Sequence, residues 1–366
     1  MENEFDINRI KNGKNFTYVD NKGRKINDKD KLDYIKKMRI PPAYRNVKIS
    51  SKKNSKRYAM GIDDKGRKQF LYSKGHNERA SKEKNLHLIQ FARVLPKIKR
   101  DINNNLHKKI VDADTARDKL ISTALKLVMD CNFRIGSEGG VDKYNSYGVS
   151  TLTKDHFNKM GGKYNIKFVG KKGVVNESKV QSKGLNNALN DILSMNKNKE
   201  VFDFIHNGGE FRVKVGAGDV NNYLKQYGDI STKNFRTWMA NIHFIDNFID
   251  VLDKRDHDLD KVTHRKKIIK KAVDNTAEKL HHTGSICKKS YIVNDLWGGF
   301  IEKPENYQDV IMSYTKTDNY KPSENSFIKF MSKYSKNNKN IDGINNNLDD
   351  NNLDDNNNLD DNNNLE

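Results

Sequence analysis

The hydrophobic and polar positions of the chain change their period near residue 79. Before that point, short segments of alternating apolar and polar residues are separated by turns rich in Asp, Asn and Gly. The segments are Phe16–Val19, Tyr58–Ile62 and Gln69–Tyr72, and the turns are Asp20–Gly23 and Asp63–Gly66. Alternation on both sides of such a turn is typical of a β-hairpin. With one short helix around Asp30–Met38, residues 1–78 are expected to form a small, mainly β domain.

Beyond residue 79 apolar residues recur at helical spacing. Thr115–Phe133 and Ile268–Leu280 each carry one apolar face, and Asp114 or Thr115 is a candidate N-cap for the first helix. Between them, residues 164–169 alternate and Gly170–Gly173 turns the chain, which predicts a β-hairpin inside a helical region. Residues 79–336 are thus expected to form a larger, mostly α-helical domain. The predicted fold class is α+β.

The last residues, 337–366, repeat short Asn/Asp runs with single leucines. Such a segment cannot bury enough apolar surface to offset its chain entropy, so a disordered tail is predicted. The net charge of the 366-residue chain is +20, and the tail from residue 340 holds eight acidic residues and no Lys or Arg, so the rest carries +28. So high a positive charge on residues 1–339 is typical of a protein that binds nucleic acid. A genome that favours lysine codons would also raise the charge without any such function.

Several classes of site are missing from the sequence. The two cysteines, Cys131 and Cys287, lie far apart and form no CxxC pair, which argues against a disulfide framework or a zinc site. There is no GxxxxGK[ST] loop and no HExxH motif, and Gly216-Ala217-Gly218 lacks the rest of a dinucleotide fingerprint. No apolar run is long enough to cross a bilayer, and the N-terminus has no signal-peptide pattern. We therefore expect an intracellular protein without a cofactor, a metal or a membrane anchor.

Phosphodiester chemistry by a tyrosine needs a particular set of residues. A phenol, with a pKa of about 10, is a poor nucleophile at neutral pH, so the phosphate must be held by cations and donors. Arginine suits this task because its planar fork matches two phosphate oxygens, and lysine can protonate a leaving oxygen. The chain supplies these types in order, in the segments Cys131–Gly136, Ile166–Gly173, Lys233–Trp238 and His281–Tyr291.

Together with Ile40–Ala43 and Gly66–Tyr72, these segments resemble the small type IB DNA topoisomerases of poxviruses, bacteria and giant viruses. The resemblance covers roughly residues 16–300. It implies a β N-terminal domain and a helical catalytic domain that form a C-shaped clamp around double-stranded DNA. It also implies a monomer that nicks one strand through a 3′-phosphotyrosyl intermediate, relaxes positive and negative supercoils, and reseals the strand without ATP or metal. The expected location is inside the cell with DNA, at a viral replication site or in the virion.

The resemblance assigns roles by motif. Tyr291 corresponds to the nucleophile, Arg134 and Arg236 to the phosphate-binding arginines, and His282 to a donor to a nonbridging oxygen, with His281 one position out of register. Lys171 corresponds to the acid for the leaving 5′ oxygen, with Lys172 as its competitor, and Lys233 to a further, supporting basic residue of the active site. In the β domain, the expected DNA contacts are Arg67, Gln69, Phe70 and Tyr72. Position 70 is tyrosine in the poxvirus enzymes, so the sequence preference of cleavage stays open.

Two other functions use parts of the same pattern. A tyrosine site-specific recombinase shares the arginine, lysine and tyrosine set, but usually has His rather than Lys three residues before the second arginine, where this chain has Lys233. A non-enzymatic DNA-packaging protein would use the basic charge alone and would give Tyr291 no role.

Overall fold

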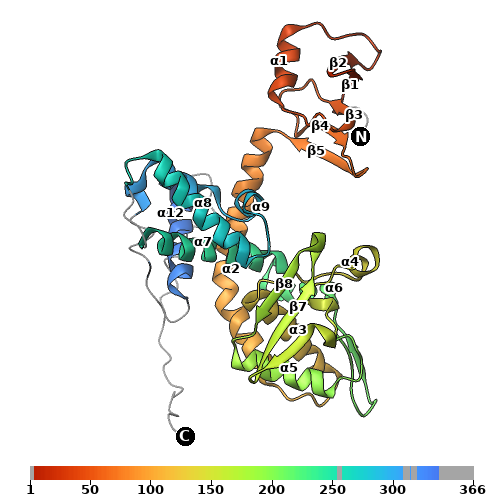
Figure 1. The fold of residues 1–366 in the computed structure, drawn as a ribbon, viewed down its shortest axis with the longest axis vertical. Coiled ribbons are helices and arrows are strands. Elements are labelled where there is room, and N and C mark those ends of the chain that lie inside the picture. Colours follow the sequence, from red (N-terminus) through yellow and green to blue (C-terminus); the bar gives the residue numbers. More distant parts are fainter. Residues whose placement is uncertain (1–3, 254–257, 308–313, 315–319, 338–366) are drawn as a thin grey trace. The chain divides into compact units, whose positions relative to one another are not determined.

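The computed structural model describes residues 4–253, 258–307, 314 and 320–337, and its chain divides into two compact units, Met1–Leu86 and His87–Glu366 (Figure 1). The predicted tail, residues 337–366, lies outside the described residues except for Asn337.

The N-terminal unit is built on one antiparallel sheet with strand order β2-β1-β3-β4-β5. The strands are β1 (Ile7–Asn12), β2 (Asn15–Asp20), β3 (Arg45–Ile49), β4 (Arg57–Ile62) and β5 (Lys68–Tyr72). Helix α1 (Lys29–Lys37) contributes Ile35 to the small core formed with Ile7, Val47, Ile49 and Ala59 of the sheet. The β4–β5 hairpin and the short helix expected from the sequence are both present.

The second unit is mostly helical. Helix α2 (Lys74–His107) begins in the N-terminal unit and continues into this one. The other helices of the described chain are α3 (Ala113–Asp130), α4 (Glu138–Tyr144), α5 (Lys183–Met195), α6 (Ala217–Leu224), α7 (Thr232–Asp253), α8 (Val262–Lys279), α9 (Gly284–Ser290), α10 (Asn294–Glu302) and α12 (Pro322–Asn337). Short 3-10 turns join them: η2 (Val149–Thr151), η3 (Lys154–His156), η4 (Lys171–Gly173), η5 (Lys225–Tyr227) and η6 (Pro304–Tyr307).

Two small sheets lie among these helices. The first has the order β6-β7-β8, from β6 (Phe157–Met160), β7 (Lys163–Val169) and β8 (Val175–Lys179), and the second pairs β9 (Asp203–Ile205) with β10 (Arg212–Lys214). The expected hairpin is β7–β8, and the sequence analysis missed β6. The Gly161-Gly162 turn before Lys163, with both glycines at positive φ, is the signal for that extra strand.

Helix α3 begins earlier than the sequence suggested. Its N-cap is Asp112, not Asp114 or Thr115. The Asp112 side chain accepts a hydrogen bond from the Thr115 amide at 2.8 Å, and the Thr115 hydroxyl oxygen accepts one from the Asp112 amide at 3.1 Å. This reciprocal capping box satisfies backbone donors that otherwise have no partner at a helix start. Helix α3 ends at Asp130, so the segment carrying Arg134 lies beyond the helix.

Candidate active site

Arg134 is placed by an unusually close approach of two backbone segments. The Arg134 and Ile135 carbonyls accept hydrogen bonds from the amides of Val149 and Ser150, each at 2.8 Å. Gly136 and Gly148 lie against each other at this crossing, where a Cβ on Gly148 would come within 2.4 Å of the Gly136 Cα. Only glycine permits so short a distance between the two chains. Arg134 is thus held by backbone contacts that do not involve its own side chain.

Arg236 lies in the first turns of α7 with its guanidinium buried; the residue is 6% exposed. Its Nη1 donates to the carbonyl oxygen of Asn132, just past the end of α3, and its Nη2 donates to the carbonyl of Leu280 at 2.9 Å, at the end of α8. Carbonyls at helix ends carry partial negative charge, which favours a cation there. The ends of two helices therefore fix the Arg236 guanidinium.

His282 is brought to the arginines by the way α8 ends. His281 adopts a left-handed conformation with φ 54°, its amide donates to Glu278, and the His282 amide donates to Ala277 at 2.9 Å. This pair of hydrogen bonds is a Schellman motif, which reverses the chain after a helix. The turn places the His282 ring between the two arginines: Nδ1 lies 3.0 Å from Arg134 Nη2, and Nε2 lies 3.0 Å from Arg236 Nη2.

Tyr291 completes the cluster. It is the C-cap of α9, and its ring centroid lies 4.6 Å from that of His282 and 6.0 Å from the Arg236 guanidinium carbon. Asn241, buried in α7, donates to the Tyr291 carbonyl at 3.1 Å and accepts from the Val293 amide at 2.8 Å. Four of the predicted residues, Arg134, Arg236, His282 and Tyr291, are thus neighbours in space. His281 is not part of this cluster; its ring faces Phe133 instead.

The cluster is electropositive, and no carboxylate counter-ion pairs with it in the described part of the chain. Among the residues that the structure describes, neither Arg134 nor Arg236 forms an ion pair with a carboxylate. Burial, together with the charge of Arg134, lowers the pKa of Arg236 to about 10, which still leaves it charged at neutral pH. Burial and then the charges of both arginines lower the pKa of His282 to about 3, so its imidazole is neutral.

A neutral imidazole cannot satisfy both arginines. One of its two ring nitrogens carries a proton and only the other can accept a hydrogen bond, yet an arginine N–H donor faces each nitrogen. One donor–donor contact is therefore left unsatisfied. An anion with several acceptor oxygens, such as a phosphate, would relieve this conflict by accepting from both guanidinium groups and from the imidazole N–H.

The two predicted lysines are not in contact with the cluster. Lys171 lies in the exposed η4 turn between β7 and β8, and Lys233 is exposed on the first turn of α7. Neither side chain forms a hydrogen bond or an ion pair with a described residue. Lys172, the competitor of Lys171, has a left-handed backbone with φ 67°.

The predicted DNA-contacting residues of the β domain divide between the two faces of β5. Phe70 and Tyr72 share one face, and the Arg57 guanidinium lies 4.9 Å from the Phe70 ring centroid. Gln69 lies on the other face and donates to Asp63 at 2.9 Å. Arg67 also pairs with Asp63, at 2.6 Å, and these hydrogen bonds hold the pKa of Asp63 far below its usual value.

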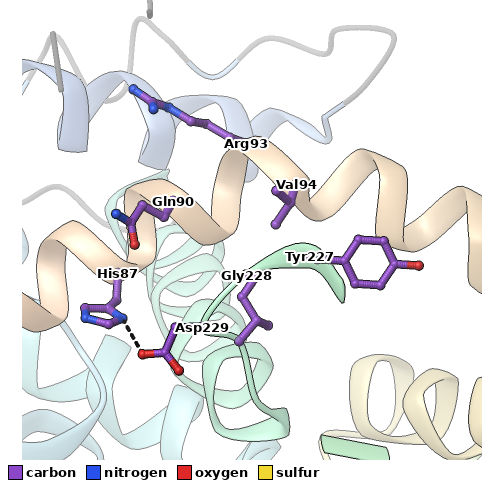
Figure 2. A pocket seen from close by; sticks show the side chains of 8 residues that line it. His87, Gln90, Arg93, Val94, Tyr227, Gly228 and Asp229 are labelled. Atoms are coloured by element: carbon purple, nitrogen blue, oxygen red, sulfur yellow. Dashed lines mark ion pairs between the residues drawn. The ribbon is translucent and has the colours of Figure 1, made fainter. Parts of the chain in front are cut away.

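Among the hollows in the described part of the helical unit, two lie near residues of interest. One, of about 380 Å³, is formed by α2 and the loop before α7, where His87 Nδ1 faces Asp229 Oδ2 at 4.0 Å (Figure 2). The other, of about 690 Å³, is lined by residues of β8 and α8 and by Asn132 and His281, beside the cluster. In the described parts of the chain, no group of three or more His, Cys, Asp or Glu side chains could hold a metal ion. No helix found there has the length and apolar character to span a bilayer.

Sequence reasoning missed the residues that hold the cluster in place. Asn132 and Leu280 act through backbone carbonyls, which any residue type carries, so no motif marks them. Asn241 acts through its side chain, and a buried asparagine on the apolar face of α7 was the available signal. The positive φ of Asn132 and His281 likewise arises from chain reversals at helix ends.

Comparison with known proteins identifies the family. The family model for the catalytic core of eukaryotic DNA topoisomerase I matches residues 73–317, and that for the N-terminal domain of bacterial DNA topoisomerase IB matches residues 15–63. DNA topoisomerase 1B of Acanthamoeba polyphaga mimivirus is 33% identical over 299 residues, which cover 79% of this chain and 85% of the relative. DNA topoisomerase 1B of Vaccinia virus (strain Copenhagen) is 26% identical over 258 residues, 70% of this chain and 76% of the relative.

DNA topoisomerase 1 of Rabbit fibroma virus (strain Kasza) is 27% identical over 237 residues, 64% of this chain and 69% of the relative. The family matches and these relatives are all topoisomerases, and the matched regions cover both the β-sheet unit and the helical unit. The recombinase and packaging alternatives are thereby set aside, and the α+β class expected from the sequence is confirmed. The chain belongs to the type IB DNA topoisomerases of the small viral and bacterial class, isomerases that relax supercoiled DNA.

Proposed function

We propose that Tyr291 attacks a phosphate of one DNA strand while Arg134, Arg236 and His282 hold its nonbridging oxygens. A bond forms between the Tyr291 hydroxyl oxygen and the phosphorus of the 3′ phosphate, and the bond from phosphorus to the 5′ oxygen breaks. The phenol proton leaves to solvent, and the departing 5′ oxygen takes a proton from Lys171. The 5′ hydroxyl later reverses the same steps and reseals the strand. Because one phosphodiester is exchanged for another, no ATP is needed.

The observation that carries this proposal is the uncompensated cationic cluster beside the Tyr291 ring. Two arginine N–H donors face opposite nitrogens of a neutral imidazole beside the Tyr291 ring, and no carboxylate of the described structure pairs with either arginine. Donors fixed in advance stabilise the extra negative charge on phosphate oxygens in the transition state more than they stabilise the ground state. These side chains supply the charge stabilisation that a metal ion would otherwise give, and the proposal therefore includes no metal.

The lysines have different proposed tasks. Lys171, at the exposed turn of the β7–β8 hairpin, is proposed to protonate the leaving 5′ oxygen, since a hairpin turn can approach a bound strand from outside the cluster. Lys233 is proposed to support the site from the first turn of α7, three residues before Arg236. Both lysines are exposed, so a bound phosphate can reach them without a rearrangement of the core.

The proposed substrate is double-stranded DNA, bound by a monomer because only one strand is cut. Arg67, Gln69, Phe70 and Tyr72 of residues 1–78 are proposed to contact it, and residues 79–336 to carry the chemistry. Arg67 and Gln69 would have to share or release Asp63 to reach DNA. The viral relatives favour action on viral DNA, at a replication site or in the virion.

The test is relaxation of supercoiled plasmid in excess EDTA without ATP, by wild type and by Tyr291→Phe. The substitution keeps the ring that packs on His282 and removes only the hydroxyl, so the protein should fold and bind DNA. Tyr144→Phe, at a tyrosine that is 76% exposed on α4, is the matched control. We expect wild type and Tyr144→Phe to relax both signs of supercoil and to form a covalent DNA adduct.

Tyr291→Phe should do neither while still binding the plasmid. A covalent adduct formed by Tyr291→Phe would assign the nucleophile to another residue. Relaxation that requires a metal ion would overturn the proposed role of the cationic cluster.

A further inference from the structure

Asn132 is contacted at two points by α7. Its backbone carbonyl accepts a hydrogen bond from Arg236, and its side-chain Oδ1 lies 3.3 Å from His243 Nε2, two turns further along the same helix. Asn132 is 7% exposed and has φ 56°, a left-handed conformation that asparagine tolerates better than most residues. Arg236 and His243 of α7 therefore both contact Asn132, which lies outside the helices.

In the described residues, the His243 side chain has one hydrogen bond, the one with Asn132. Burial, with the charges of Lys279 and Lys321, lowers the pKa of His243 to about 4, so the ring is neutral at physiological pH. Its Nε2 must then carry the proton, because Asn132 Oδ1 is an acceptor. The other ring nitrogen, Nδ1, is buried without a hydrogen-bond partner in the described structure. Leaving a buried polar atom unpaired costs stability, so packing alone gives no reason for a histidine here.

The two carbonyls that hold Arg236 differ in how firmly they are fixed. The Leu280 carbonyl lies at the end of α8, where the Schellman turn defines its direction. The Asn132 carbonyl lies two residues past α3, and within the described part of the chain the side chain of this residue has one hydrogen bond, with His243. The hydrogen bond with His243 thus ties the Asn132 side chain to the same helix that carries Arg236.

We infer that Asn132 is a positioning residue whose carbonyl aims the Arg236 guanidinium at the scissile phosphate, and that His243 fixes Asn132 for this purpose. The inference rests on the proposed role of Arg236 in holding that phosphate. An error of about 1 Å in the place of a catalytic group can lower a rate by about 100-fold, so a loosened carbonyl should be visible in the chemical step.

Asn132→Gly tests the inference directly. Glycine adopts the positive φ without strain and keeps the carbonyl, but removes the amide that His243 holds. The control is Asn46→Gly, at an exposed left-handed asparagine with φ 48° in β3. Single-turnover cleavage of a DNA substrate that releases its 5′ strand should slow by about 10- to 100-fold in Asn132→Gly, with unchanged DNA affinity. Asn46→Gly should cleave like wild type.

A double-mutant cycle distinguishes positioning from a general structural effect. If Asn132 acts through Arg236, Asn132→Gly should change the cleavage rate less than about 2-fold in an Arg236→Ala background, because the group that it aims is gone. An equal slowing in both backgrounds would overturn the inference and leave the proposed function standing. An Arg236→Ala variant that cleaves at the wild-type rate would instead refute the proposed role of Arg236.

His243 provides a second test that does not alter Asn132. His243→Gln keeps an N–H donor near the position of Nε2, whereas His243→Leu has similar bulk and no donor. We expect His243→Gln to cleave faster than His243→Leu while the two melt at similar temperatures. Equal cleavage rates in the two variants would show that the hydrogen bond to Asn132 does not matter.

Discussion

Replacing Gly148 by alanine should disturb the active site through the backbone alone. The added Cβ would lie 2.4 Å from the Gly136 Cα, 2.5 Å from the Gly136 nitrogen and 2.8 Å from the Arg134 carbonyl oxygen. Carbon atoms in contact normally stay about 3.5 to 4.0 Å apart. All three neighbours are backbone atoms, which cannot rotate away as a side chain can. The segment carrying Arg134 must therefore move by about 1 Å.

Two measurable effects should follow. Overpacking of this kind costs about 1 to 3 kcal/mol of folding free energy. The shift also strains the hydrogen bonds from the Val149 and Ser150 amides, which hold the Arg134 segment at 2.8 Å each. Because a 1 Å displacement of a catalytic group lowers a rate by about 100-fold, single-turnover cleavage by Gly148→Ala should slow by roughly that factor.

Gly139→Ala is the matched control, since a Cβ there meets no atom within 4 Å and its φ is not in the left-handed region. The assay combines thermal unfolding with single-turnover cleavage for both variants. Gly139→Ala should match wild type in both measurements. If Gly148→Ala also melted and cleaved like wild type, the close backbone crossing would not be what holds Arg134.

Two further predictions concern the buried residues His243 of α7 and Glu324 of α12. The pKa of His243 is about 4 in the folded chain and 6.5 in the unfolded chain. As the pH falls below 6.5, the unfolded chain is therefore protonated at this residue before the folded chain is. The folded chain loses stability between about pH 6.5 and 4 for this reason. His243→Gln has no group that titrates here, so its free energy of unfolding, measured with urea, should fall by about 2 to 3 kcal/mol less between pH 7 and pH 4.5 than that of wild type. The same pH dependence in both proteins would contradict the lowered pKa of His243. Glu324, 4% exposed, accepts hydrogen bonds from Lys99 at 2.9 Å and from the Trp238 indole at 3.3 Å. Glu324→Ala should destabilise the fold by about 1 to 3 kcal/mol, because the buried Trp238 indole N–H loses its acceptor while Lys99, whose side chain is 31% exposed, can turn to water. A loss below about 0.5 kcal/mol in thermal or urea unfolding would show that the indole finds another acceptor.

The sequence specified the local elements well where one period dominated. The apolar face of α8 and the alternation of β4 and β5 were found because neighbouring residues along the chain decide them. Strand β6, with the sequence Phe-Asn-Lys-Met, was missed because it has no alternation of its own and forms by pairing with β7. The predicted N-cap of α3, Asp114 or Thr115, was wrong, and the observed N-cap is Asp112. The helix start is defined by the reciprocal hydrogen bonds between Asp112 and Thr115 and not by the first residue of the apolar face.

By itself the sequence determined which residue types are present and in what order, and this was enough to indicate the family and to select Arg134, Arg236, His282 and Tyr291. The tertiary structure alone decided how they meet: Arg134 reaches His282 across 148 positions, and Arg236 reaches Asn132 across 104. No local pattern encodes contacts over such separations, because they depend on how α3, α7 and α8 pack. The burial that keeps His282 neutral and the helix-end carbonyls that hold Arg236 arise from the same packing.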